Sequence, residues 1–90
     1  MRGDIIVNPV AGEKRTGRIA EEEATYMQSA GWETEVQPTA HGGHATELAR
    51  DRADVELVVA IGGDGTLRET VAGLAGDQVP VGFIPIGKAN

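Results

Sequence analysis

The sequence contains no cysteine, and this absence removes several classes of protein at once. Disulfide scaffolds, thiolate metal sites and cysteine nucleophiles all need this side chain, so none of them fits the chain. The absence suits a reducing compartment, because thiol-free chains need no oxidising environment. We therefore expect the protein in the cytoplasm.

A surplus of basic residues is also missing. Lys and Arg number 8 against 14 Asp and Glu, which gives a net charge of −6. This balance excludes nucleic acid as the expected partner and leaves no polybasic patch for an anionic membrane. No stretch approaches the ~20 apolar residues of a membrane span. The start is unlike a signal peptide, since Asp4 interrupts it and Pro9 soon follows. We expect a soluble, intracellular chain.

Glycine, by contrast, is abundant. The 90 residues are enough for one small domain, and 13 of them are glycine. These glycines gather at the ends of apolar runs. Loops that approach a ligand closely need glycine at such places, because no Cβ then stands in the way. The distribution indicates ligand-binding loops.

Short apolar runs alternate with longer amphipathic stretches along the chain. Residues 57–61 are continuously apolar, which predicts a strand covered on both faces. Gly31 stands where a helix C-cap is expected. The last amphipathic stretch carries Leu67, Val71 and Leu74 on one predicted side. The predicted strands cover residues 4–8, 32–36, 57–61 and 81–84, and the predicted helices cover 16–30, 44–53 and the segment after Gly65.

This order predicts an α/β fold, a parallel sheet with flanking helices of Rossmann-like type. Ligands bind such sheets beyond the carboxyl ends of the strands. We therefore expect the site in the loops that leave the four strands, residues 8–17, 37–43, 62–66 and 85–90. The sequence stops at Asn90, inside a loop that has just left a strand. We interpret the chain as a truncated domain.

The strongest local signal is Gly62-Gly63-Asp64-Gly65-Thr66-Leu67-Arg68-Glu69, between a buried strand and a predicted helix. Free N–H groups and the helix dipole favour an anion there. Asp64 is the unusual member, because a carboxylate repels phosphate. It makes sense if it binds Mg²⁺, accepts a proton or reaches a sugar hydroxyl. A structural alternative is a capping box formed by Thr66 and Glu69, which needs no ligand.

The motif resembles the family of diacylglycerol, sphingosine and bacterial lipid kinases. The opening Asn8-Pro9-Val10-Ala11-Gly12 is similar to that family's loop after the first strand. Pro85-Ile86-Gly87, with Asn90, resembles its third nucleotide loop. The three motifs stand in the family's order and cover essentially the whole chain. The glycine-aspartate loop alone is also similar to NAD kinases.

The resemblance implies an ATP-dependent lipid kinase that transfers the γ-phosphoryl group of ATP to a lipid such as diacylglycerol. Residues 1–90 would be its nucleotide-binding part, with ATP and Mg²⁺ as cofactors and Asp64 as the catalytic residue. A second, mostly β domain would carry the lipid site and is absent from this chain. Peripheral membrane contact would then come through that domain, and a homodimer stays open. The implied nucleotide-binding residues are Asn8, Thr39, Gly62, Gly63, Asp64, Gly65, Thr66, Leu67, Arg68, Glu69, Gly87, Lys88 and Asn90.

Two positions depart from the family's pattern. Lys88 stands where the family usually has threonine, and His44 stands where an acidic residue is common. Lys88 also creates a near match to a P-loop, but the first glycine of that match, Gly82, lies within a strand and Ala89 has no hydroxyl for Mg²⁺. The alternatives are an NAD kinase-like enzyme, or a nucleotide-binding module without catalysis. His41 and His44 suggest a metal only weakly, because no third ligand is evident; no residue is assigned to a metal.

Overall fold

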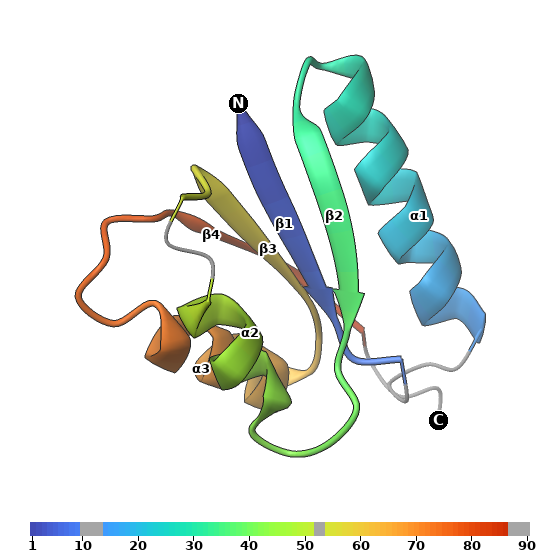
Figure 1. The fold of residues 1–90 in the computed structure, drawn as a ribbon. Helices are drawn as coiled ribbons and strands as arrows, with labels where there is room; N and C mark the ends of the chain where they lie inside the picture. Colours follow the sequence, from blue (N-terminus) through green and yellow to red (C-terminus); the bar gives the residue numbers. More distant parts are fainter. Residues whose placement is uncertain (10–13, 52–53, 87–90) are drawn as a thin grey trace.

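The structure is a computed structural model that describes residues 1–9, 14–51 and 54–86. Within these ranges strands and helices alternate along the chain, as predicted (Figure 1). The elements are β1 (Arg2–Val7), α1 (Lys14–Ser29), β2 (Glu33–Pro38), α2 (His44–Arg50), β3 (Leu57–Gly62), α3 (Asp64–Gly73) and β4 (Val81–Pro85).

The four strands form one parallel sheet in the order β2-β1-β3-β4. The predicted α/β fold is therefore confirmed. In the centre of the sheet, Ile5 of β1 pairs with Val36 of β2 on one side and with Val59 of β3 on the other. Strands β1 and β3 are buried almost throughout, which confirms the expectation that residues 57–61 are covered on both faces.

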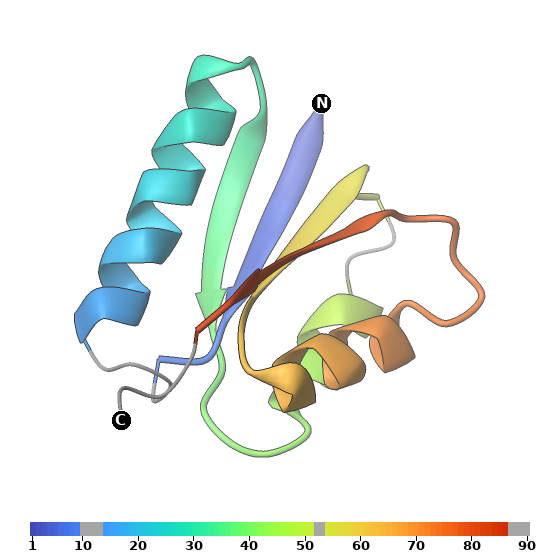
Figure 2. The ribbon, with the colours of Figure 1, turned by 180° about the vertical axis from the view of Figure 1, so that it is seen from behind.

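Helices cover the two faces of the sheet unequally. Helix α1 lies along one face beside β2 and β1, whereas α2 and α3 pack on the other face (Figures 1 and 2). The residues of each strand alternate between these layers. The α1 layer buries Ile5, Val7, Ala20, Ala24, Met27, Val59, Ile61 and Ile86. The layer of α2 and α3 buries Ile6, Ala45, Ala49, Val55, Val58 and Leu74.

Helix α1 ends in a Schellman motif. Gly31 has φ 94°, and its N–H donates to the carbonyl of Gln28 at 3.0 Å. The N–H of Trp32 donates to the carbonyl of Met27, also at 3.0 Å. This pair of hydrogen bonds satisfies the last free carbonyls of the helix and needs a left-handed residue between them. The predicted C-cap role of Gly31 is confirmed.

Helix α3 buries a different side from the one predicted. Leu74 is buried, but Leu67 is only half-buried and Val71 is 50% exposed. The buried face carries Thr66, Thr70 and Gly73 instead. Small residues allow α3 to lie close against α2. A Cβ built on Gly73 would come within 2.4 Å of the Thr46 carbonyl oxygen and 2.8 Å of the Ala49 Cβ. Close helix packing therefore outweighs apolar periodicity in this helix.

Candidate functional site

The loops at the carboxyl edge of the sheet are anchored by backbone hydrogen bonds that extend the strand ladders. Asn8 donates its N–H to the carbonyl of Ile61 at 2.9 Å, and Thr39 donates to Val7 at 2.8 Å. Beside β4, at the same carboxyl edge, Ile86 donates its N–H to the carbonyl of Gly62 at 2.8 Å. The start of each loop is thus fixed to the neighbouring strand, which holds residues from distant parts of the sequence side by side.

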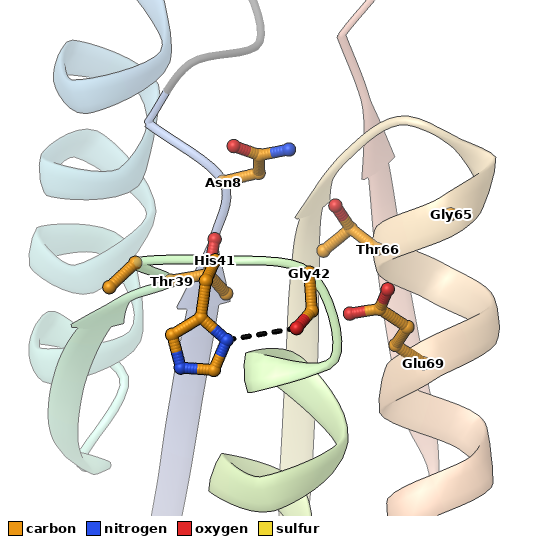
Figure 3. Close-up of a pocket in the computed structure, with 8 residues that line it drawn as sticks. Asn8, Thr39, His41, Gly42, Gly65, Thr66 and Glu69 are labelled. Carbon is orange, nitrogen blue, oxygen red and sulfur yellow. Dashed lines mark hydrogen bonds between the residues drawn. The ribbon is translucent and has the colours of Figure 1, made fainter.

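A pocket of about 300 Å³ opens at this edge (Figure 3). One side belongs to the loop between β2 and α2, and the other to the first two turns of α3, with Asn8 at the end of β1. In Figure 3 the Glu69 side chain points from α3 towards the loop. The lining residues are Asn8, Thr39, Ala40, His41, Gly42, Gly65, Thr66 and Glu69.

The turn from β3 into α3 is very tight. Gly62 ends the strand, Gly63 is the N-cap in extended conformation, and the helix begins at Asp64. A Cβ on Gly62 would lie 2.6 Å from the Thr66 hydroxyl oxygen and 3.2 Å from the Asn8 Cβ. Only glycine leaves room for the first turn of the helix to fold back on the strand.

The suggested capping box does not form. Thr66 lies in the first turn of α3 and not at the N-cap, which is Gly63 and has no side-chain cap hydrogen bond. The sequence alternative failed because the helix starts earlier than the Thr-x-x-Glu pattern implies. The first N–H groups of α3 therefore face the carboxyl edge of the sheet without a side-chain acceptor from the N-cap.

Glu69 instead connects α3 to α2. Its Oε1 accepts a hydrogen bond from the N–H of Gly43 at 3.2 Å. Its backbone carbonyl accepts another from the hydroxyl of Thr46 at 2.8 Å. Gly43 is the N-cap of α2 and has φ 81°, so the loop turns left-handed there. Glu69 therefore fixes the end of the β2–α2 loop that borders the pocket.

The structure brings together part of the predicted site. Asn8, Thr39, Gly65, Thr66 and Glu69 line the pocket. The other predicted residues of the glycine-aspartate loop lie on β3, at the N-cap of α3 or on α3 and are not in the lining: Gly62, Gly63, Asp64, Leu67 and Arg68. Asp64 is exposed at the first position of the helix. The predicted residues Gly87, Lys88 and Asn90 lie outside the described residues.

Three further residues line the pocket that were not assigned to the site from sequence, namely Ala40, His41 and Gly42. They belong to the 37–43 loop, which was expected near the ligand because it leaves the carboxyl end of a strand. His41 is an exposed residue of this loop and lies beside Thr39 in the lining, a place that its residue type alone does not indicate. The edge rule for parallel sheets was the signal that could have found it.

His41, His44 and Glu47 form a cluster whose potential ligand atoms lie within 4.8 Å of one another. The hydrogen bonds do not suit a metal ion. The Nδ1 of His44 accepts the N–H of Ala40 at 2.8 Å, so its other ring nitrogen carries the proton. A metal-bound histidine has the opposite arrangement and donates from the nitrogen that does not touch the metal. Glu47 is a third potential ligand, so the expectation that no third ligand lies near the two histidines was wrong. The hydrogen bond to His44 leaves His41 and Glu47 as the members of the cluster that could coordinate an ion in this arrangement.

Among residues 1–9, 14–51 and 54–86, none of the helices combines the length and the apolar character that crossing a bilayer requires.

The fold is a parallel α/β sheet with a glycine-rich turn at its carboxyl edge. Residues 3–90 match the model of the "Diacylglycerol kinase catalytic domain" family. The chain therefore belongs to the diacylglycerol kinase catalytic domain family. The resemblance to this family that the sequence motifs indicated is therefore confirmed.

Individual relatives agree with the family assignment. The chain is 36% identical over 93 residues to a diacylglycerol kinase of Bacillus subtilis, and 38% identical over 94 residues to one of Staphylococcus carnosus. A solved structure of a diacylglycerol kinase from Bacillus anthracis superposes with a TM-score of 0.76 at 30% identity. Each comparison covers 99% of this chain, but only 31%, 30% and 31% of the respective relative. The chain spans about a third of their length.

Proposed function

We propose that this chain is the nucleotide-binding part of an ATP-dependent lipid kinase, which transfers the γ-phosphoryl group of ATP to a hydroxyl group of a lipid such as diacylglycerol. The observation that carries this proposal is the start of α3. It has no side-chain cap and lies at the carboxyl edge of the sheet, directly beside the pocket. A helix N-terminus of this kind favours phosphate. Membership of the diacylglycerol kinase family supports the same conclusion.

The pocket residues suit a nucleotide in distinct ways. Gly65 and Thr66 would present backbone N–H groups of the first helical turn to the phosphates, and the Thr39 hydroxyl would contact them from the opposite wall. Asn8 would contribute its amide from the end of β1. Phosphoryl transfer depends mainly on such positioning and on neutralising the phosphate charge.

Asp64 would supply the charge interaction that backbone groups cannot. Its carboxylate is exposed at the first residue of α3, where it is accessible to a metal–nucleotide complex. Carboxylate oxygens are ligands that Mg²⁺ prefers, so the donor chemistry fits this ion. When bound, Mg²⁺ would neutralise charge on the phosphates. The same exposed position would also allow the alternative roles of Asp64, which are accepting a proton and binding a ribose hydroxyl.

The proposal extends to parts of the protein beyond this chain. The relatives are about three times as long, which is consistent with a second, β-rich domain that holds the lipid site and contacts the membrane peripherally. A cytoplasmic location and a homodimer are part of the same hypothesis. The contribution of Lys88 to phosphate binding also stays a prediction.

The test is Asp64→Asn in the full-length protein. We expect turnover of ATP with diacylglycerol vesicles to fall at least about a hundredfold, in the range seen when an electrostatic or acid–base group is lost. Thermal unfolding should change little, because Asp64 is exposed and loses only its interaction with the helix dipole. Asp77→Asn is the matched control, since Asp77 is an exposed carboxylate in the segment between α3 and β4. Turnover of the Asp64 variant close to that of the control would reduce Asp64 to a turn residue.

A second measurement separates binding from transfer. The 90-residue chain alone should bind ATP weakly and should not phosphorylate any lipid, because the proposed acceptor site lies elsewhere. Rapid lipid phosphorylation by this chain would refute the two-domain proposal.

A further inference from the structure

The backbone of the β2–α2 loop is held by the ring of His44. The N–H of Ala40 donates to the Nδ1 of His44 at 2.8 Å. Ala40 stands between Thr39 and His41, and all three line the pocket. On its other side the loop is fixed to the sheet, because Thr39 donates its N–H to Val7. The hydrogen bond to the His44 ring therefore fixes the backbone at Ala40, the first residue after Thr39 contacts the sheet.

This hydrogen bond exists only while the imidazole of His44 is neutral. Nδ1 must offer a lone pair to the Ala40 N–H, which leaves the ring proton on Nε2. A protonated imidazole is a donor at both nitrogens and accepts nothing. Two N–H groups would then point at each other across 2.8 Å, and the loop and the ring would have to separate. Histidine is the side chain that ordinarily changes charge between pH 5 and 8.

The charged neighbours of His44 come from every element around it. The ring of His41, in the loop, is stacked on the His44 ring with centroids 4.6 Å apart and planes inclined by 16°. Glu47 of α2 completes the cluster and lies 3.8 Å from the Nε2 of His41. Glu69 of α3 accepts the N–H of Gly43, next to His44.

We propose that His44 is a positioning residue of the nucleotide site, whose neutral ring holds the Thr39–Ala40 segment in its binding position and releases it on protonation. The inference rests on the proposed function, because it takes the pocket to be the ATP site. Nucleotide affinity should therefore fall on acidification through the loss of one hydrogen bond from the loop. His44 itself does not line the pocket, so it acts through Ala40.

The experiment compares two substitutions of His44, one that keeps a hydrogen-bond acceptor for the Ala40 N–H without a group that gains charge, and one that removes the acceptor. His44→Asn keeps a side-chain oxygen near the place of Nδ1 but gains no charge between pH 5.5 and 8. His44→Leu has comparable bulk and removes the acceptor. The dissociation constant of ATP with Mg²⁺ is measured for the full-length wild type and both variants across this range. Because phosphate groups also titrate near pH 6, the informative quantity is the ratio of wild type to His44→Asn at each pH.

We expect wild type and His44→Asn to bind similarly at pH 8, with the wild type weaker by about three- to tenfold at pH 5.5, the effect of one hydrogen bond. His44→Leu should bind about three- to tenfold more weakly at both pH values. The control is His41→Asn, which removes the neighbouring imidazole; on acidification its affinity should fall relative to that of His44→Asn, as the wild type's does. The ring ¹⁵N shifts of His44 in the nucleotide-free protein should show the proton on Nε2 at pH 8.

The possible failures are distinguishable. A ratio that stays constant between pH 5.5 and 8, in a wild type that binds ATP, would overturn the role of His44 and leave the proposed function intact. A proton on Nδ1 at pH 8, or normal affinity of a folded His44→Leu variant, would overturn it as well. A folded wild type without ATP binding at any pH would overturn the proposed function, and this inference with it.

Discussion

The two walls of the pocket are held in place by different kinds of interaction. The α3 wall depends on the backbone, because Gly62 lets the helix start directly against the strand and bring Thr66 to the pocket. The opposite wall, the β2–α2 loop, depends on side chains. His44 holds its beginning at Ala40, and Glu69 holds its end at Gly43.

The difference separates a rigid wall from an adjustable one. A Cβ added at Gly62 would lie 2.6 Å from the Thr66 hydroxyl oxygen and 3.1 Å from the Thr66 Cβ, so Thr66 would have to move. The loop wall depends on acceptors whose hydrogen bonds contribute about 1 kcal/mol each. Part of the site is thus fixed with the fold, whereas the other part responds to protonation and to small substitutions.

The largest loss of stability is expected from a substitution at the contact between α2 and α3, the helices that border the two walls. Gly73→Val should lower the free energy of unfolding by about 3 kcal/mol, because its side chain would meet the Thr46 carbonyl and the Ala49 Cβ. Chemical denaturation measures the change. Ala72→Val, on the exposed side of the same helix, is the control and should cost about 0.5 kcal/mol. Equal effects of the two substitutions would mean that the helices do not pack closely at Gly73.

Gly62→Ala should disturb the α3 wall alone. We expect a loss of about 1–2 kcal/mol in stability, together with at least about tenfold weaker ATP binding, because Thr66 must move. Gly31→Ala is the matched control: Gly31 also has a positive φ, but a Cβ there meets nothing within 4 Å. It should lose about 1 kcal/mol in stability and bind ATP normally. Normal binding by Gly62→Ala would show that the tight turn serves the fold and not the site.

The smallest of these effects is expected at the end of the loop wall. Glu69→Ala removes the acceptor for the Gly43 N–H and should weaken ATP binding about three- to tenfold. Glu69→Gln keeps a side-chain oxygen there and should lie between this variant and the wild type. If Glu69→Gln binds as weakly as Glu69→Ala, the charge of Glu69 matters more than its hold on the loop. Isothermal titration calorimetry distinguishes these outcomes.

The sequence predicted the order of elements well, because apolar runs and glycine punctuation report local structure directly. Gly31 and the strand at 57–61 are examples of such local signals. The buried face of α3 was not predictable in this way. Its identity depends on Gly73 meeting α2, a contact between segments that are far apart in the sequence.

The site shows the same division. Thr66 and Glu69 could be selected from their motif, but the motif did not reveal that Glu69 accepts the N–H of Gly43. The hydrogen bond from Ala40 to His44 depends on the orientation of one ring in a short turn. Sequence spacing cannot specify such an orientation, so His44 appeared only as a departure from the family's pattern and as a weak metal candidate.

The position of β1 has a consequence for how the molecule folds. This strand comes first in the chain but lies in the interior of the sheet, between β2 and β3. During synthesis the backbone N–H and C=O groups of β1 have no partners until β2 and β3 have been made, and β3 is complete only at Gly62. Parallel pairings of such separation close large loops and form slowly. The run Ile5-Ile6-Val7, which is buried in the finished sheet, therefore needs protection from aggregation while the chain emerges.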